Sequence, residues 1–226
     1  MYRKYVYSQT TWFDIVSADT SELVEIANLY SLDKDVVKNI ANDTGVSTVE
    51  HFNDGVYISL FVPCIQNERG KEVVSHKRIC FVLGSNFVIT SRFNDIQGFK
   101  QAKKTLKNNP VFAESFSLFF FQTILKSIYG QIRDDVVGVL PHRDLEHGSK
   151  KMLAEYEQII DVHKEILTVF SAIALEFFTN PTSTDSLQEI MSDYEQLRAI
   201  IREQNTVHLL CEKESYLSKI KKLLTK

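Results

Sequence analysis

The sequence predicts an α+β fold, in which a mostly antiparallel sheet with packed helices is followed by a long helical hairpin and a long C-terminal stalk helix. Two observations lead to this prediction. Residues 1–110 alternate short aromatic and β-branched runs with turn signals, whereas residues 111–180 carry apolar residues at helical spacing. The segment from Ser183 to Lys226 contains no glycine or proline, which favours one continuous helix of roughly 65 Å.

Composition limits the functions that the chain can have. It has 226 residues, of which 44% are hydrophobic, so it can bury a substantial core. The net charge of −3 gives no indication of nucleic-acid binding. Cys64, Cys80 and Cys211 lie far apart and form neither a disulfide framework nor a metal-binding pattern, which indicates a reducing compartment. The most apolar run, Phe116 to Leu125, is too short to span a bilayer, so the chain as given is expected to be soluble.

Strands and short helices are expected throughout residues 1–110. Asp19, Thr20 or Ser21 can cap a first helix that continues to Tyr30. Turn signals at residues 53–55 and 84–86 each lie between two strand-like runs and predict two β-hairpins. The predicted strands are 5–7, 11–16, 46–52, 56–62, 73–83 and 87–91, and the further helices are 34–41 and 96–106.

Two long helices are expected in residues 111–180. The first, over about 111–137, carries its phenylalanines and isoleucines on one face. The second has an apolar seam in alternating steps of four and three, the rhythm of a coiled coil. This seam consists of Met152, Tyr156, Ile159, His163, Ile166, Phe170, Ile173 and Phe177. The two helices are therefore predicted to pair as an antiparallel hairpin.

The third long helix has a seam that changes character along its length. It begins with Leu187, Ile190 or Met191, Tyr194, Leu197 and Ile201. In the same register it continues with Gln204, His208, Cys211, Ser215 and Ser218, which are polar or small. Two explanations remain open: a register stutter within a bundle, or a polar face turned towards a wet axis between symmetry-related copies.

Three motifs in order resemble a known family. They are Thr11-Trp12-Phe13-Asp14, Val49-Glu50-His51-Phe52, and the strand pair from Arg78 to Thr90, which contains Leu83-Gly84-Ser85-Asn86-Phe87. Together with the three long helices that follow, they are similar to the cytoplasmic domain of the CorA family of magnesium channels. The resemblance divides the chain into an α/β head (1–110), a helical hairpin (111–180) and a stalk helix (181–226).

The resemblance implies a homopentamer in which the stalk helix lines the pore and continues into the first membrane span. The Gly-Met-Asn signature and the spans of that family are absent from this sequence. Either the chain is a fragment, soluble by itself, whose full-length form sits at the cytoplasmic face of the inner membrane, or it is a soluble relative. Lysines concentrate near Lys226, as expected for a segment close to the cytoplasmic side of a membrane.

The resemblance also implies a regulatory divalent-cation site between the head of one subunit and the stalk of the next. The corresponding positions are Asp54 in the head and Asp193 or Glu195 in the stalk, with Asn53 where the family often has an acid. Mg²⁺ prefers oxygen ligands and keeps much of its water, so weak regulatory binding is expected. The alternative is that Asp54 is a turn residue and that the stalk acids form a solvated face.

No enzyme signature is present in the sequence, which lacks a glycine-rich phosphate loop, a nucleophile elbow and a zinc-binding helix. The predicted function is a regulatory domain that senses a divalent cation and gates a channel for Mg²⁺, with Co²⁺ or Ni²⁺ as further cargo. The alternatives are the cytoplasmic domain of a ZntB-like zinc transporter and a soluble oligomeric sensor or interaction protein with the same fold. Asp14 is expected to fix the end of its strand.

The polar part of the third seam leads to a first prediction. Because Gln204 and the residues after it reduce the apolar area that copies of this helix can bury, the 226-residue chain should associate only weakly. Sedimentation velocity at micromolar concentration should show a monomer or a concentration-dependent mixture. A tight pentamer at the lowest concentration would contradict this prediction.

Overall fold

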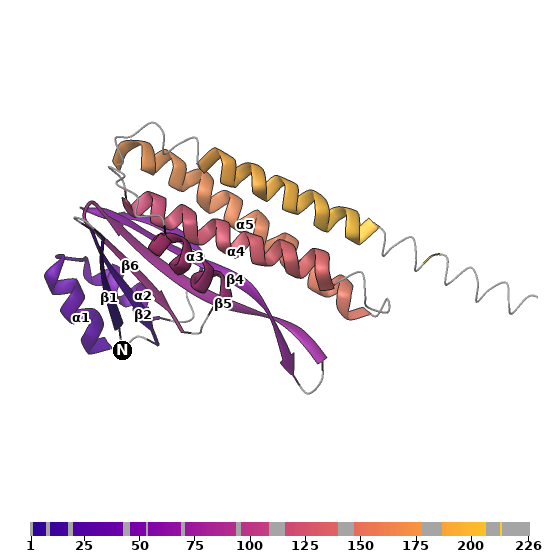
Figure 1. Ribbon diagram of the computed structural model, residues 1–226, viewed down its shortest axis with the longest axis horizontal. Helices are drawn as coiled ribbons and strands as arrows, with labels where there is room; N and C mark the ends of the chain where they lie inside the picture. The colour runs from indigo at the N-terminus through magenta and orange to yellow at the C-terminus, as the bar shows by residue number, and fades with distance from the viewer. Residues whose placement is uncertain are drawn as a thin grey trace, which may run out of the picture.

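The computed structural model describes residues 2–7, 10–17, 20–42, 46–52, 54–68, 71–93, 96–108, 116–139, 147–177 and 187–206, together with residue 213. One six-stranded sheet lies between two layers of helices (Figure 1). Helices α1 (Thr20–Leu29) and α2 (Lys34–Ala41) cover one face. The other face carries α3 (Gln97–Asn108), α4 (Phe116–Val139), α5 (His147–Phe177) and a helix over residues 187–206, called here the C-terminal helix.

The sheet is mostly antiparallel, which confirms the predicted fold class. Its order is β1-β2-β6-β5-β4-β3, and only the β2–β6 pair is parallel. The parallel pair arises because the chain leaves β2 through α1 and α2 and returns to it only with β6, the last strand of the antiparallel meander β3-β4-β5-β6. The strands are β1 Tyr2–Tyr7, β2 Thr10–Val16, β3 Thr48–Phe52, β4 Gly55–Glu68, β5 Lys71–Gly84 and β6 Phe87–Arg92.

The hairpin of β4 and β5 is longer than the sequence predicts. The apolar pattern ends the first strand at Val62 and begins the second at Val73, whereas the two strands remain paired as far as Glu68 and Lys71. Backbone hydrogen bonding continues there in residues whose sequence lacks a clear apolar alternation. Pro63 is compatible with this position because β3 pairs with β4 only as far as Ser59, which leaves Pro63 on an edge.

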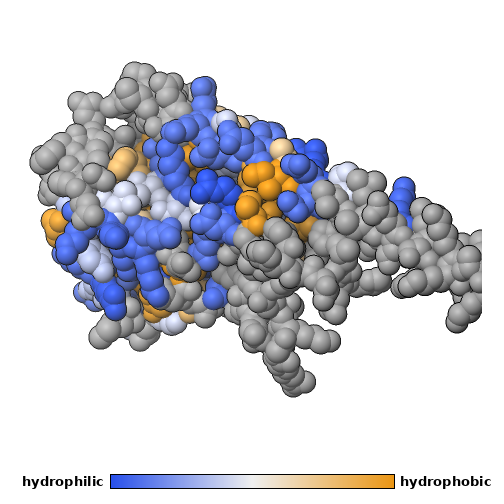
Figure 2. Space-filling view, turned by 45° about the vertical axis from the view of Figure 1, so that its right-hand side comes forward, coloured by the Kyte–Doolittle hydropathy of each residue, from blue (hydrophilic) through white to orange (hydrophobic). Residues whose placement is uncertain are grey.

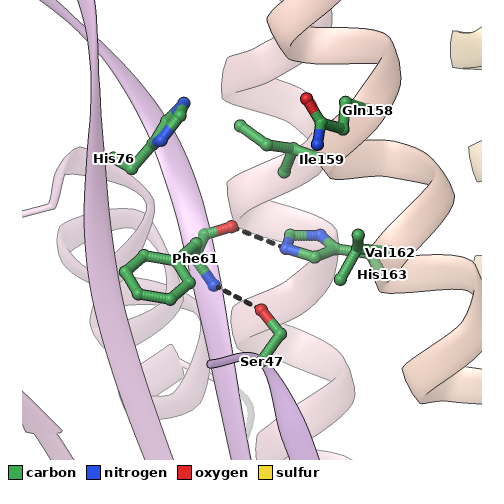
Figure 3. A pocket seen from close by; sticks show the side chains of 7 residues that line it. All are labelled: Ser47, Phe61, His76, Gln158, Ile159, Val162 and His163. Atoms are coloured by element: carbon green, nitrogen blue, oxygen red, sulfur yellow. Dashed lines mark hydrogen bonds between the residues drawn. The ribbon is translucent and has the colours of Figure 1, made fainter. Parts of the chain in front are cut away.

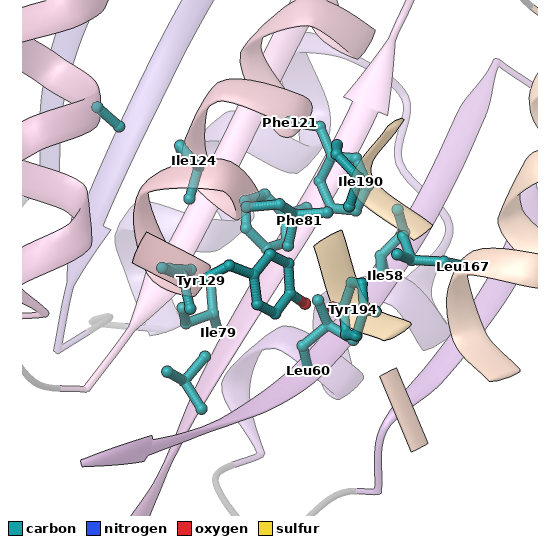
Figure 4. Packing of buried hydrophobic residues seen from close by; sticks show 14 of the residues in the cluster. Ile58, Leu60, Ile79, Phe81, Phe121, Ile124, Tyr129, Leu167, Ile190 and Tyr194 are labelled. Atoms are coloured by element: carbon teal, nitrogen blue, oxygen red, sulfur yellow. The ribbon is translucent and has the colours of Figure 1, made fainter. Parts of the chain in front are cut away.

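Alternation along the strands divides the core between the two faces of the sheet. In β2, Trp12 lies on the face covered by α3, α4 and α5, whereas Phe13 and Ile15 lie on the face covered by α1 and α2. The larger core continues without interruption from Trp12 to Ile201 in the C-terminal helix. Figure 4 shows its centre, where strand residues meet side chains from α4, α5 and the C-terminal helix.

The helical hairpin of α4 and α5 is confirmed, with a small rotation of the α5 seam (Figure 1). Met152, Tyr156, His163 and Phe170 are buried as predicted. Leu167 and Ala174 are buried more deeply than the predicted Ile166 and Ile173, which are only partly buried. The reason is that α5 contacts both the sheet and the neighbouring helices, so it needs a wider apolar stripe than a two-helix seam.

The first half of the predicted stalk seam is also confirmed. Leu187, Ile190, Tyr194, Leu197 and Ile201 are each at most 3% exposed. The predicted continuation from position 208 to 218 lies outside the described residues. The described part of the chain is helical over 187–206 and at 213, and the rest of the predicted helix from 183 to 226 is likewise outside it.

Asp14 lies in the middle of a buried ion-pair cluster, so the expectation that it fixes a strand end is wrong. Its carboxylate is 1% exposed and accepts hydrogen bonds from Arg92 of β6 and from Lys103 of α3, the latter at 2.5 Å. Thr90 donates to the same carboxylate at 3.3 Å and accepts from the indole N–H of Trp12 at 3.0 Å. The cluster therefore ties β2 and β6 to α3.

The electrostatics of this cluster favour the ionised carboxylate. Burial by itself would raise the pKa of Asp14, but hydrogen bonds and positive charge from Arg92 and Lys103 outweigh it and hold the pKa below its usual value. The Arg92 guanidinium also lies 4.2 Å from the centre of the Phe99 ring, which orients it towards β2.

A second buried polar group, His163, joins α5 to the sheet and to α4. Its Nε2 donates to the backbone oxygen of Phe61 at 2.7 Å (Figure 3). Its Nδ1 accepts from the Tyr129 hydroxyl at 2.9 Å. A carbonyl can only accept, so Nε2 carries a hydrogen, and in the neutral ring this leaves Nδ1 to accept from the Tyr129 hydroxyl. Burial lowers the pKa of His163 to about 4, because a charged ring would lose its hydration; the hydrogen bond to the Phe61 carbonyl offsets part of this effect.

Replacing Asp14 by Asn should destabilise the fold by about 3–5 kcal/mol, because Arg92 would keep a buried charge without its counter-ion. Urea unfolding followed by circular dichroism measures this loss. The control is Lys126→Met, which removes the exposed ion pair with Glu189 and should cost at most about 1 kcal/mol. Equal losses in the two variants would contradict the assignment.

Acid should weaken the fold through His163. Between an ordinary pKa of 6.5 and a folded-state pKa of about 4, the unfolded chain binds a proton that the folded chain does not, so stability falls as pH falls through this window. The loss amounts to about 3 kcal/mol. Urea unfolding at pH 7 and pH 4 should show this extra loss in the natural chain and not in His163→Gln. If the free energy of unfolding depended on pH identically in both chains, His163 would be ruled out as the cause of the loss.

Candidate functional site

The predicted head ligand, Asp54, lies in the turn between β3 and β4 and is exposed. Its neighbour Gly55 explains how the turn is placed. A Cβ at Gly55 would come 2.4 Å from the backbone oxygen of Leu83, so only glycine allows the start of β4 to lie this close to the end of β5. Asp54 is thus held at one end of the sheet, with its side chain directed to solvent. Asn53 lies outside the described residues.

The predicted stalk ligands, Asp193 and Glu195, are both exposed on the C-terminal helix. They are two residues apart and therefore lie on different sides of the helix. Glu195 faces α5, where Lys164 forms an ion pair with it. The hydrogen bond from Lys164, followed by the charges of Lys164 and the nearby arginines, lowers the pKa of Glu195. Within the described residues, no ion pair involves Asp193.

A single chain does not bring these carboxylates together into a metal centre. Within the described residues, no group of three or more histidine, cysteine, aspartate or glutamate side chains is placed to hold a metal ion. Because the site is predicted to lie between subunits, the arrangement within one chain does not test it. Asp54 with Asp193 or Glu195 therefore stays a prediction.

A small cavity of about 160 Å³ lies between α5 and β4 (Figure 3). Ser47, which directly precedes β3, lines it, and the Ser47 hydroxyl accepts a hydrogen bond from the Phe61 N–H at 3.3 Å. His163 borders this cavity, but the hydrogen bonds to Tyr129 and Phe61 occupy both of its ring nitrogens. The ring therefore offers no free lone pair to a metal ion. The lining residues are Ser47, Phe61, His76, Gln158, Ile159, Val162 and His163.

Sequence reasoning missed the roles of Asp14 and His163. The Trp12-Phe13-Asp14 order does contain a signal, because an acid between apolar residues of a strand must find a partner if both faces are buried. The position of His163 in an apolar seam likewise indicates a buried polar group that needs a hydrogen-bond partner. In both cases the partners come from elements far away in the sequence, so the pattern does not identify them.

In the described part of the chain, every helix is too short or too polar to cross a membrane.

Comparisons with known proteins support this fold and show the family of the chain. The sequence profile of the family described as "CorA-like Mg2+ transporter protein" matches residues 7–135. This range includes the three motifs of the head and most of α4. No curated protein matches the sequence.

Solved structures match over nearly the whole chain. The soluble domain of CorA from Methanocaldococcus jannaschii has a TM-score of 0.73 at 13% identity, covering 91% of this chain and 87% of that one. The complete CorA magnesium transporter of the same organism has a TM-score of 0.69 at 17% identity, covering 98% of this chain and 75% of that one.

The cytoplasmic domain of ZntB from Vibrio parahaemolyticus RIMD 2210633 has a TM-score of 0.73 at 10% identity, covering 95% of this chain and 89% of that one. At these identities the structural matches show a common fold. The family profile matches more than half of the residues, and the chain therefore belongs to the family of CorA-like Mg²⁺ transporter proteins.

Proposed function

We propose that this chain is the cytoplasmic regulatory domain of a divalent-cation channel, and that cation binding between subunits controls the pore. The observation that carries the proposal is the family match over residues 7–135, together with a fold that agrees with CorA over the hairpin and the C-terminal helix. Transport would be driven by the membrane potential through spans that lie beyond this sequence. The domain itself would do no chemistry.

The regulatory site of this proposal joins Asp54 of one subunit to the C-terminal helix of the next. Exposure of Asp54 and Asp193 supports it, because both carboxylates are available to a neighbouring chain. Glu195 is the weaker partner, since Lys164 already neutralises it. A hydrated Mg²⁺ between two carboxylates would bind weakly and would hold the subunits in one arrangement, the closed state of the channel.

Assembly into a homopentamer, with the C-terminal helix next to the pore, belongs to the same proposal. The C-terminal helix buries one seam and leaves most of its other side chains exposed or half-buried, and this is the surface that further copies would contact. On the face shown in Figure 2, a compact hydrophobic area interrupts a mostly hydrophilic described surface. Hydrophobic areas of this kind often mark contacts with other chains.

Zinc is the second candidate cargo, and the match to the ZntB cytoplasmic domain is the observation that favours it. The gene sequence beyond Lys226 tests the channel proposal. Two apolar runs with Gly-Met-Asn between them are expected, whereas a stop codon would indicate the soluble sensor. Uptake of ²⁸Mg²⁺ and ⁶⁵Zn²⁺ into cells that express the full-length protein then identifies the cargo.

Magnesium should stabilise the assembled domain through Asp54 and Asp193. At ten times its dissociation constant, an ion that binds only the folded assembly adds about 1.4 kcal/mol, or roughly 3–6 °C in melting temperature. Calorimetry at high protein concentration, with millimolar MgCl₂, measures this gain. Asp54→Ala combined with Asp193→Ala should abolish it without changing the melting temperature in EDTA.

A matched control replaces two other exposed acids, Asp134 of α4 and Glu203 of the C-terminal helix, by alanine. This control has the same change in net charge and should keep the response to Mg²⁺. An unchanged response in the Asp54 and Asp193 variant would rule out this site.

A further inference from the structure

Ion pairs join α5 to the C-terminal helix along one side of their contact. Each successive member on α5 lies four or three residues further along, and its partner lies the same number of residues earlier, as antiparallel helices require. The first two pairs have the acid on α5, and the third has it on the C-terminal helix. In order along α5, they are Glu157–Arg202 at 2.7 Å, Asp161–Arg198 at 3.0 Å and Lys164–Glu195.

The apolar seam beneath these pairs repeats every seven residues and so admits more than one register, although the Tyr194 ring, whose centre is 4.1 Å from that of Tyr129, favours the observed one. The buried residues of the C-terminal helix repeat in steps of three and four, so a shift by seven residues puts Tyr194 in place of Leu187 and Ile201 in place of Tyr194. On α5, the same shift exchanges Ile160 with Leu167. A shifted pair would therefore still bury apolar side chains against each other.

The charges distinguish between these registers. A shift by seven residues in one direction places Glu195 opposite Glu157, and a shift in the other direction places Arg202 opposite Lys164. Both shifts also separate the three attractive pairs. In the third pair the base is on α5 and the acid is on the C-terminal helix, the reverse of the first two pairs. For this reason each shifted register brings two like charges together. If all three acids were on α5, neither shift would do so.

We propose that this row of ion pairs is a register lock, and that Lys164 and Glu195 are the residues that decide it. Individually, such partly exposed pairs contribute little to stability. Their role is to select one register among those that the seam accepts. Lys126 of α4, which is 2.5 Å from Glu189, supports the same register from the other side. The lock makes the C-terminal helix and the hairpin move along their common axis as one body.

The register can be measured directly with spin labels on exposed positions of the two helices. Ala172 on α5 and Thr206 on the C-terminal helix are exposed, and both can be replaced by cysteine. Cys64→Ser and Cys211→Ser remove two native thiols, and the buried Cys80 stays. In the observed register the two labelled positions are roughly 19 residues, or about 28 Å, apart along the axis. Double electron–electron resonance on the 226-residue chain should show one distance near this value.

Charge reversal should shift the register in opposite directions. In the Lys164→Glu variant, the shift that places residue 164 opposite Arg202 creates an attractive pair. A second distance of about 18 Å between the labelled positions should therefore appear. In the Glu195→Lys variant, the shift that places residue 195 opposite Glu157 creates an attractive pair. The second distance should then be about 39 Å. The variant that carries both changes restores three attractive pairs in the observed register, against one attractive contact in each shifted register, so the distance of the natural chain should again be the main one.

Retention of the single distance in both reversed variants would overturn the proposal, because the seam would then set the register without help from the charges. If the reversed chains do not fold, as judged by circular dichroism, the neutral variants Lys164→Gln and Glu195→Gln take their place in the same distance measurement. A second distance in either variant supports the lock, and a single unchanged distance in both overturns it. None of these outcomes depends on Mg²⁺, so the test is independent of the proposed regulatory site.

Discussion

The burial of both faces of one sheet is the constraint on which the rest of this structure depends. A strand that is buried on both sides must present apolar residues in both directions, as Ile79 to Leu83 of β5 do. Each face then needs its own layer of helices. Helices α1 and α2 supply a thin layer on one side, and the long helices supply a thick one on the other (Figure 1).

The same constraint makes the few buried polar groups of the sheet important, because each must find its partners inside the protein. Arg78 shows how this is achieved on the face of α1 and α2. It donates to Ser59 at 2.8 Å, to the Tyr57 hydroxyl at 2.7 Å and to the backbone oxygen of Asn39 at 2.9 Å. Through the last bond it holds the end of α2 against the sheet. Asp14 does the same for α3 on the other face.

The regulatory proposal and the register lock place different demands on the C-terminal helix. Its side towards α5 is committed to the ion pairs that involve Glu195, whereas Asp193 remains exposed for a neighbouring subunit. A cation that binds Asp193 would therefore act on a helix whose position along α5 is already defined. Such a helix can transmit a displacement to the hairpin, because the packed seam and the ion pairs leave no intermediate register for it to adopt.

The sequence by itself determined the fold class, the position of nearly every element and the seam of the C-terminal helix from Leu187 to Ile201, because these follow from local periodicity and turn residues. The motifs around Trp12, Phe52 and Leu83 also led to the family. Only the tertiary structure decided the extension of the β4–β5 hairpin, which relies on cross-strand backbone bonds, and the rotation of the α5 seam, which depends on the layers that α5 touches. Arg92 lies 78 residues from Asp14 and Phe61 lies 102 residues from His163, so no local pattern identifies these partners; they are set by which elements the folded sheet brings together.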